Sequence, residues 1–195
     1  MAIVQRKKRK KFNILRENKD LSSIYPDLPQ EDECFKVISC GGFSSIAFIY
    51  FVSQKSKINW MYASSLRIGR KHLMALDMLH KRGKLGYCKF VVGKIMEQDK
   101  SQKVKKYQYY NDMESVCRKN GWDYMAINNH SKVILFDTDC GKFVLETSSN
   151  LNENPSIEQF SFEKDQELFD DYLEAFGKIF SEKIGEEILE KKEGG

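Results

Sequence analysis

Residues 130–150 read HSKVILFDTDCGKFVLETSSN, and this stretch decides how the rest of the chain is interpreted. It holds two apolar runs separated by turn-forming residues at 139–142. The pattern predicts two neighbouring antiparallel strands joined by a wide hairpin end. His130 and Lys132 are two residues apart, so on a strand their side chains point to the same face of the sheet.

Polar residues close the second apolar run. Ser148 and Asn150 follow it, and the hairpin returns them to the end where His130 and Lys132 begin the first run. The predicted cluster therefore combines one nucleophile or base, one fixed positive charge and two neutral hydrogen-bonding groups. Such a set suits an anionic tetrahedral group, and phosphate is the commonest candidate.

The spacing of these residues resembles a known motif. HxKxxxxD followed by GSxN is the HKD motif of the phospholipase D superfamily. His130, Lys132 and Asp137 match its first half, and Ser148 and Asn150 match its second half. The motif covers about a tenth of the chain, and the order of strands and helices extends the resemblance to most of residues 33–160. We expect Asp137 to be a structural member of the motif.

The match departs from the family pattern at two points. Thr147 stands where the family has glycine, and its side chain would crowd a substrate that has to approach the backbone closely. Nine residues separate Asp137 from Thr147, more than in the family, and we expect the extra residues to lie in the turn at 139–142. Glu158 stands where many members have an acidic residue that orients the histidine.

The resemblance implies a mechanism. His130 would attack phosphorus and form a covalent phosphohistidine, or act as the general acid. Lys132 and Asn150 would hold the non-bridging oxygens, Ser148 would assist, and Glu158 would fix the tautomer of the imidazole. This chemistry needs no cofactor and no metal, so we expect neither.

The mechanism needs two imidazoles, whereas the motif supplies one. His72 and His80 fall in a predicted helix and are expected at its surface, without a lysine partner of the HxK kind. Single-copy members of the superfamily act as homodimers, which implies that His130 from each of two subunits enters one site.

The alternation of patterns predicts the fold class. Besides the hairpin, strands are expected at 34–40, 58–63, 87–95 and 122–127, with helices at about 44–54, 70–82 and 102–119. This order predicts an α/β fold with a mixed β-sheet flanked by helices on both faces, similar to one phospholipase D-like unit. Amphipathic helices at 165–192 are expected to pack against the sheet domain or to form a dimer contact. The predicted divisions are a basic, flexible arm at 1–30, an α/β domain at 31–160 and an acidic helical extension at 161–195.

The charge distribution points to an anionic partner. The net charge is +4, with RKKRKK at residues 6–11 and eleven acidic against five basic side chains in residues 161–195. A basic arm binds nucleic acid or simply solubilises the chain, and both readings stay open. Arg67 and Arg70 precede a helix at an expected ligand-binding edge and are candidates for contacting a substrate backbone. A second set of basic residues forms either a nucleic-acid track or solvated helix faces: Lys81, Arg82, Lys84, Lys103, Lys105 and Lys106.

Cysteine usage and hydropathy indicate the compartment. The five cysteines show no CxxC pair and no metal-ligand spacing, which favours free thiols in a reducing cytoplasm. No apolar run approaches the roughly 20 residues of a membrane-spanning helix, and we see no secretory signal. Gly41-Gly42 is expected to form a tight turn, with anion binding by its N–H groups as the weaker alternative.

These observations favour a metal-independent nuclease that acts as a cytoplasmic homodimer on DNA or RNA, with DNA favoured. A first alternative is a phospholipase D-like nucleic-acid-binding or assembly module that has lost turnover. A second alternative is a phospholipid hydrolase or transferase.

Overall fold

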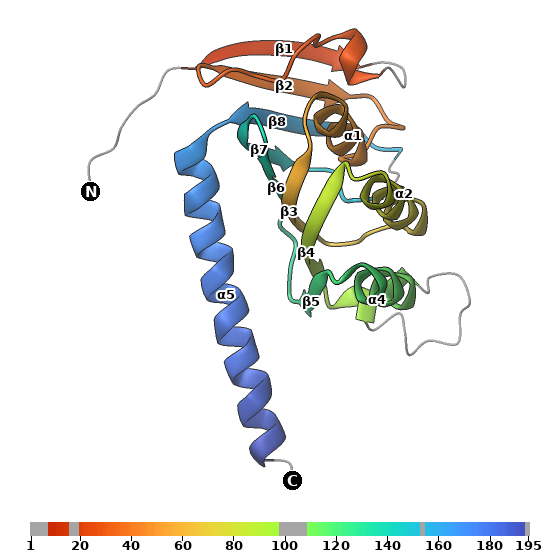
Figure 1. Ribbon diagram of the computed structural model, residues 1–195, viewed down its shortest axis with the longest axis vertical. Coiled ribbons are helices and arrows are strands. Elements are labelled where there is room, and N and C mark those ends of the chain that lie inside the picture. The colour runs from red at the N-terminus through yellow and green to blue at the C-terminus, as the bar shows by residue number, and fades with distance from the viewer. Residues whose placement is uncertain (1–7, 16–19, 98–108, 153–154, 194–195) are drawn as a thin grey trace.

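The computed structural model describes residues 8–15, 20–97, 109–152 and 155–193, with side chains up to residue 181. These residues form one mixed eight-stranded sheet in the order β1-β2-β8-β7-β6-β3-β4-β5. Helices lie on both faces of the sheet (Figure 1). The predicted class, an α/β fold with a mixed sheet, helices on both faces and a C-terminal helical extension, is confirmed.

The elements alternate along the chain as the sequence indicated. The strands are β1 (Arg9–Leu15), β2 (Glu33–Ser39), β3 (Ile58–Ser65), β4 (Leu85–Gly93), β5 (Asp123–Ile127), β6 (Val133–Thr138), β7 (Gly141–Thr147) and β8 (Glu158–Lys164). The helices are the short 3-10 helix η1 (Leu21–Ser23), α1 (Ile46–Lys55), α2 (Arg70–Lys81), α4 (Tyr109–Asn120) and α5 (Gln166–Glu193). The predicted helix at 102–119 is observed from Tyr109, and its residues 102–108 lie outside the described residues.

Parallel and antiparallel pairs are combined in the sheet. β3 pairs parallel with β4, β4 with β5, and β1 with β2, whereas β6, β7 and β8 form antiparallel pairs with their neighbours. The carboxyl ends of β2, β3, β4, β5 and β7 therefore meet the amino ends of β6 and β8 at one edge. Ligands commonly bind outside the carboxyl ends of the strands in open α/β sheets.

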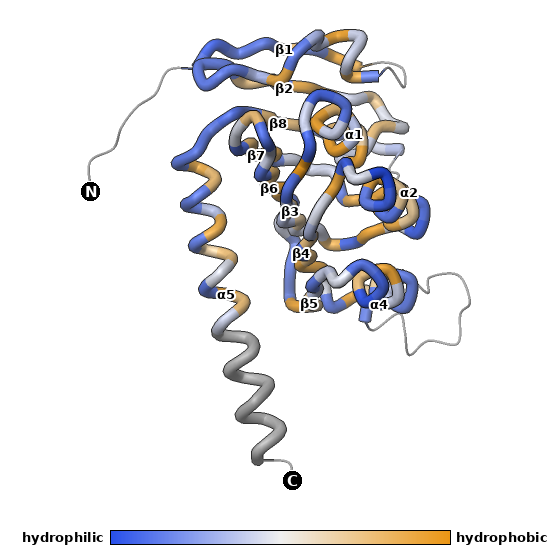
Figure 2. The backbone as a smooth tube through the Cα atoms, viewed as in Figure 1, coloured by the Kyte–Doolittle hydropathy of each residue, from blue (hydrophilic) through white to orange (hydrophobic). Residues whose placement is uncertain are grey.

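A phenylalanine-rich core lies between the sheet and the helices α1, α2 and α4. Phe162 of β8 is fully buried at its centre, with ring centroids 5.4 Å from Phe48 of α1 and 5.6 Å from Phe143 of β7. Inward-facing residues of the strands alternate with residues of the opposite face, as the two-residue period of a strand requires. Figure 2 shows the apolar positions on the sides of α1, α2 and α4 that face the strands.

Helix α5 covers part of the second face. Phe169, Phe176 and Phe180 are buried there against residues of β3, β4, β6 and β7, and the Phe176 ring stacks on Tyr62 at 4.6 Å. The prediction that the C-terminal segment packs against the sheet is confirmed for its described side chains. Figure 1 shows α5 starting beside β8 and running towards and past β5, away from β1 and β2.

The N-terminal region differs from the predicted flexible arm at 1–30. Residues 1–7 lie outside the described residues, but Arg9–Leu15 forms the edge strand β1, parallel to β2. Leu21, Tyr25 and Leu28 are buried in the main core. An edge strand tolerates successive lysines because one backbone edge and much of its side-chain surface stay in solvent. A basic run is therefore compatible with a strand as well as with an arm.

The predicted boundary between residues 160 and 161 also differs from the structure. Glu158–Lys164 is the strand β8, inserted between β2 and β7, and the helical extension begins at Gln166. Phe160 and Phe162 alternate towards the core. The strand was not predicted because its acidic residues, and the serine between the two phenylalanines, resemble the polar sequence of the acidic C-terminal segment.

The hairpin between β6 and β7 is tight rather than wide. Thr138 pairs with Gly141, which leaves only Asp139 and Cys140 in the loop. Gly141 has a φ of +128°, a conformation that favours glycine. The residues between Asp137 and Thr147 therefore lie mostly in the two strands and not in the turn.

Helices α2 and α4 are joined by a cluster around Asp77. Its carboxylate is 2.9 Å from the Lys81 ammonium, 3.0 Å from that of Lys119, and accepts a 3.0 Å hydrogen bond from the side-chain amide of Asn120. The hydrogen bond with Lys81, followed by that from Asn120, holds the pKa of Asp77 well below its usual value.

Candidate active site

The loop between β5 and β6 carries His130 and is anchored by Asn129. The Asn129 amide nitrogen lies 3.0 Å from the Ser64 hydroxyl, 3.3 Å from the carbonyl of Ser65 and 3.0 Å from that of Val91. Its amide oxygen accepts bonds of 2.9 Å from both the backbone N–H and the hydroxyl of Ser131. One side chain thus ties the loop to the carboxyl ends of β3 and β4.

His130 and Lys132 are brought into contact. Both precede β6, and the Lys132 ammonium lies 3.2 Å from His130 Nδ1 and donates a 2.8 Å hydrogen bond to the His130 carbonyl. His130 is exposed, whereas Lys132 is half-buried. Neither residue belongs to the strand, which begins at Val133 and not at His130 as predicted.

The second half of the motif lies beside the first. The N–H of Thr147 donates a 3.1 Å bond to the carbonyl of Lys132, which continues the ladder of β6 and β7 to the site. The Ser148 hydroxyl donates to the carboxylate of Glu158 and accepts a 3.0 Å bond from the N–H of Gln159. Glu158 is buried at the start of β8.

The charges of Lys132 and Glu158 act on each other. Desolvation lowers the pKa of Lys132, and the negative charge of Glu158 opposes that shift. Glu158 is thus close enough to Lys132 to stabilise its ammonium, while its carboxylate is held by Ser148.

Thr147 occupies its position without backbone strain. No non-glycine residue in the described part of the chain has a positive φ, so this position does not need the conformational freedom of glycine. The Thr147 hydroxyl accepts a 2.9 Å bond from the N–H of Ser149 and helps to hold the loop that leads to Asn150.

Asn150 and Arg67 lie in two loops that pack together. The N–H of Leu151 donates a 3.0 Å bond to the Ser65 hydroxyl, and Ile68 forms a parallel β-bridge with Leu151. Within the described residues, Asn150 Oδ1 and Arg67 Nε are buried without a hydrogen-bond partner. Buried polar atoms of this kind call for an explanation, and a bound polar group is one.

Two sequence-based candidates are elsewhere. Arg70 begins α2, is exposed and forms a 3.2 Å ion pair with Asp112 of α4. Asp137 lies near the far end of β6 from Lys132, opposite Lys142 in the tight hairpin. Asp137 therefore does not share the cluster formed by the other motif residues.

Both His72 and His80 were expected at the surface of the helix, and this expectation is wrong for His72. His72 is buried, with Nε2 3.0 Å from the Ser44 hydroxyl, because the first turn of α2 packs against the Gly-rich loop after β2. His80 is half-buried, with Nδ1 2.9 Å from the carbonyl of Leu85 and its ring against Trp122.

The glycine pair after β2 makes a close turn. Gly41 and Gly42 have φ values of +105° and +69°, and a Cβ atom on Gly41 would lie 2.6 Å from the carbonyl oxygen of Pro155. This approach explains the glycine without a ligand, in line with the tight turn that the sequence favours.

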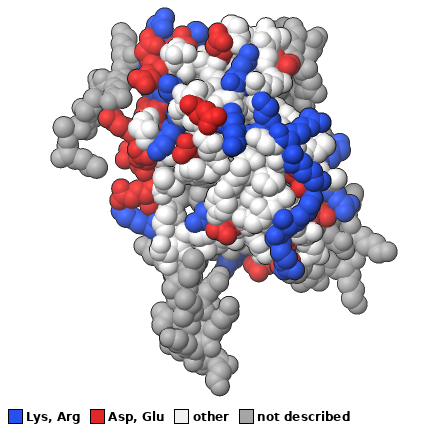
Figure 3. Space-filling model, in the orientation of Figure 1, with Lys and Arg blue, Asp and Glu red and all other residues white. Residues whose placement is uncertain are grey.

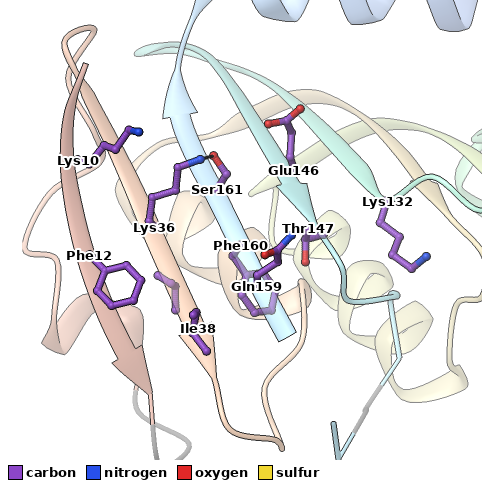
Figure 4. Close-up of a pocket in the computed structure, with 11 residues that line it drawn as sticks. Lys10, Phe12, Lys36, Ile38, Lys132, Glu146, Thr147, Gln159, Phe160 and Ser161 are labelled. Atoms are coloured by element: carbon purple, nitrogen blue, oxygen red, sulfur yellow. Dashed lines mark hydrogen bonds between the residues drawn. The ribbon is translucent and has the colours of Figure 1, made fainter. Parts of the chain in front are cut away.

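Two hollows flank the His130–Lys132 pair. One, of about 520 Å³, crosses the exposed half of the sheet and is lined by residues of β1, β2, β8 and β7 and by Lys132 (Figure 4). The other, of about 470 Å³, holds His130 beside Phe176 and Ile179 of α5. The site therefore opens on both sides of the loop that carries the histidine.

The proposed lysine track is only partly described. Lys81, Arg82 and Lys84 are exposed, Lys81 is paired with Asp77, and Lys103, Lys105 and Lys106 lie outside the described residues. On the face seen in Figure 3, basic side chains form a band on the side where α2 and α4 lie. Its role as a nucleic-acid track stays a prediction.

Comparison with known proteins shows the fold and no more. No family model and no curated protein matches the sequence. Over 83% of this chain, the fold is similar to that of polyphosphate kinase from Porphyromonas gingivalis, with a TM-score of 0.56 and 11% identity. This chain spans 29% of the length of that protein.

Weaker similarities extend to two other solved structures. TrmBL2, an archaeal chromatin protein whose structure shows a novel mode of DNA binding, has a TM-score of 0.48 and 11% identity over 75% of this chain and 52% of its own. Phosphatidylserine synthase from Haemophilus influenzae Rd KW20 has a TM-score of 0.46 and 15% identity over 73% of this chain and 37% of its own.

The described residues contain neither a membrane-spanning helix nor a cluster of metal ligands. No described helix is both long and apolar enough to cross a bilayer, and no described group of three or more His, Cys, Asp or Glu side chains has the geometry to hold a metal ion.

Sequence reasoning missed the anchoring role of Asn129. The signal in the sequence is an asparagine immediately before the loop histidine, in Asn129-His130-Ser131. An amide flanking a loop histidine is a plausible anchor because it can donate to carbonyls and accept from N–H groups at once.

Proposed function

We propose that this protein is a metal-independent phosphodiesterase of the phospholipase D type that hydrolyses nucleic acid. The contact between the His130 imidazole and the Lys132 ammonium, at the edge where the carboxyl ends of the strands meet, supports the proposal most strongly. Glu158 acts electrostatically on Lys132 and accepts a hydrogen bond from Ser148, and the resemblance to the HKD motif implies that Asn150 belongs to the same site.

Each residue has a role in the proposed reaction. A ring nitrogen of His130 attacks phosphorus, the bond to the leaving oxygen breaks, and a second imidazole protonates that oxygen. Water then attacks the phosphohistidine, giving up its proton to the second imidazole and freeing His130. Lys132 and Asn150 neutralise and bind the non-bridging oxygens throughout.

The second imidazole is proposed to be His130 of another copy of the chain. A ring that is protonated on both nitrogens is the form of a general acid, and it becomes neutral when it gives a proton to the leaving oxygen. A ring that carries its proton on Nδ1 has a free Nε2 lone pair and is the form of a nucleophile. A two-fold homodimer supplies one ring in each form.

Charge favours nucleic acid as the substrate class. The net charge is +4, and Lys10, Lys36 and Lys132 line the hollow next to the site. We propose DNA ahead of RNA, and action in the cytoplasm, which is supported by five free cysteines.

Cleavage assays in the presence of EDTA test this function. Labelled single-stranded and duplex DNA and RNA are incubated with wild type, with His130→Ala, and with Asn128→Ala as a control at the exposed neighbouring position. We expect cleavage by wild type and Asn128→Ala and its loss in His130→Ala.

Other outcomes would identify the alternatives. Binding without cleavage by wild type would indicate a nucleic-acid-binding module. Release of a head group from phospholipid vesicles, without cleavage of any nucleic acid, would indicate a phospholipid hydrolase or transferase.

A further inference from the structure

The half of the sheet that α5 leaves uncovered carries a continuous groove. Its floor crosses the strands from β1 through β2 and β8 to β7 and ends at Lys132 (Figure 4). Four strand spacings separate β1 from β6, or roughly 19 Å at about 4.8 Å per strand. The groove therefore leads from the edge of the sheet directly to a residue of the candidate active site.

Lysine side chains lie at both ends of this groove. Lys10 of β1 and Lys36 of β2 line the end far from the site, and Lys132 lines the near end. In the described part of the chain, Lys8 and Lys11 are in ion pairs with Glu163 and Glu33, whereas Lys10 is in none.

The remaining polar contacts leave the groove positive. Lys36 donates to the hydroxyl of Ser161, a neutral partner, and forms no ion pair within the described residues. Glu146, the one carboxylate among the lining residues, is already bonded by the hydroxyl of Tyr172. Three ammonium groups against one carboxylate give the groove a net positive charge.

An exposed aromatic ring lies among these lysines. Phe12 of β1 is 57% exposed, and it faces the groove beside Ile38 (Figure 4). Single exposed apolar side chains are normal in folded proteins, so it is the position of Phe12 among lysines, and not its exposure alone, that points to a ligand. An aromatic ring set between cations is the arrangement that stacks an unpaired base while lysines hold the backbone.

From this geometry we propose that the groove binds single-stranded nucleic acid and delivers the strand to the His130–Lys132 pair, an inference that rests on the proposed function. A base stacks on Phe12, and successive phosphates contact Lys36 and Lys10 at one end and Lys132 at the other. A duplex is the poorer ligand because its bases are stacked on each other and not available to Phe12.

Acidic residues limit the path. Beyond Lys10 and Lys36 the same face continues into a second hollow with Glu163, Asp165 and Asp171, close to the start of α5. Carboxylates repel phosphate, so the strand lies across β1, β2 and β8 towards the site and does not turn along α5.

Binding is measured by fluorescence anisotropy with labelled dT12, rU12 and a 12-base-pair duplex, using His130→Ala protein so that nothing is cleaved. The double substitution Lys10→Gln/Lys36→Gln is compared with Lys55→Gln/Lys57→Gln, which removes two exposed lysines at the end of α1 and the start of β3. The slope of log affinity against log salt concentration changes by about 0.7 for each phosphate that a lysine neutralises on a single strand. We therefore expect this slope to become shallower by about 1.4 in the Lys10→Gln/Lys36→Gln variant only, which corresponds to about 25-fold weaker binding at 0.1 M salt.

The stacking partner is tested separately. Phe12→Ala is compared with Met74→Ala on α2, an apolar side chain of similar exposure at 59%. We expect a loss of roughly five- to 150-fold for Phe12→Ala, since stacking a base on an aromatic ring is worth about 1–3 kcal/mol, and less than a twofold change for Met74→Ala. The dT12 and rU12 arms decide between DNA and RNA.

Several results would overturn the groove. The first is an equal loss of affinity in the two double lysine variants. The second is tighter binding of the duplex than of dT12 and rU12, or no binding of either single strand. The third is a Phe12→Ala protein that changes from dimer to monomer and still binds the single strands. The last would make this face a contact between copies of the chain. Binding as expected together with a wild type that cleaves nothing would refute the proposed function and leave the groove in place.

Discussion

Replacing Asn129 with alanine should both destabilise the protein and misplace His130. The Asn129 side chain contacts three acceptors through its nitrogen and two donors through its oxygen. Two amide protons and two lone pairs limit it to four full hydrogen bonds. Because Ser131 is exposed, water can replace the bonds to the amide oxygen.

The hydrogen bonds that are lost on the buried side of Asn129 determine how far the free energy of unfolding should fall. The carbonyls of Ser65 and Val91 belong to buried residues and would lose a donor. At about 1–1.5 kcal/mol for each of two such bonds, the free energy of unfolding should fall by about 2–3 kcal/mol. For a chain of this length, that change corresponds to a melting temperature lower by about 4–12 °C.

Activity should respond more strongly than stability. A displacement of His130 by about 1 Å would lower the rate of cleavage by about 100-fold under single-turnover conditions. Asn128→Ala, at the exposed neighbouring position, should leave both the melting temperature and the rate near their wild-type values. Equal melting temperatures and equal rates for Asn129→Ala and Asn128→Ala would refute the anchoring role.

Three further predictions concern the scaffold. Gly41→Ala should lower the free energy of unfolding in urea titrations by at least about 1–3 kcal/mol, because φ is +105° and the new Cβ would lie 2.6 Å from the Pro155 carbonyl oxygen. Gly177→Ala in α5, where a Cβ meets nothing within 4 Å, should raise the free energy of unfolding by about 0.5–1 kcal/mol. A change of the same sign in both variants would contradict this explanation. Phe162→Ala should cost about 3–5 kcal/mol in the same titrations, and a loss below 1 kcal/mol would mean that the phenylalanine core is not packed around this ring. Because the pKa of Asp77 is lowered in the folded protein, its carboxylate stabilises the fold above the unfolded-state pKa of 3.8, and this stabilisation is lost as the pH falls below that value. Asp77→Asn should therefore be less stable than wild type at pH 7, and the difference should shrink below pH 4. A difference that does not depend on pH would show that the charge of Asp77 is not involved.

The sequence predicted the alternating part of the fold well, because there local pattern and tertiary role agree. The helices α1 and α2 and the strands β2, β3 and β4 fall within two or three residues of the predicted bounds. Their apolar periodicities match the faces that they bury. The short hairpin loop was misjudged because its length depends on strand pairing, which the turn residues alone do not determine.

The two strands that were missed carry charges that a local reading assigns to solvent. β1 is lysine-rich because it lies at an edge, and β8 places Phe160 and Phe162 inward among glutamates and lysine. Whether a charged segment pairs with a sheet depends on residues distant in sequence, here those of β2 and β7.

The sequence predicted the contact between His130 and Lys132 but not most of the contacts around it. The HxK spacing placed His130 beside Lys132, whereas the hydrogen bond between Ser148 and Glu158 was not predicted. The burial of His72 against Ser44 and the anchoring of the loop by Asn129 arise from packing between loops, which has no periodic signature.

Trapping of the covalent intermediate tests the central claim most directly. Wild-type protein is mixed with a phosphodiester substrate, quenched in alkaline denaturant to preserve the acid-labile phosphorus–nitrogen bond, digested and analysed by mass spectrometry. The proposal predicts a phosphoryl or nucleotidyl adduct on His130 that accumulates during turnover. Turnover that continues in His130→Ala protein, with no adduct on His130 in wild type, would contradict it.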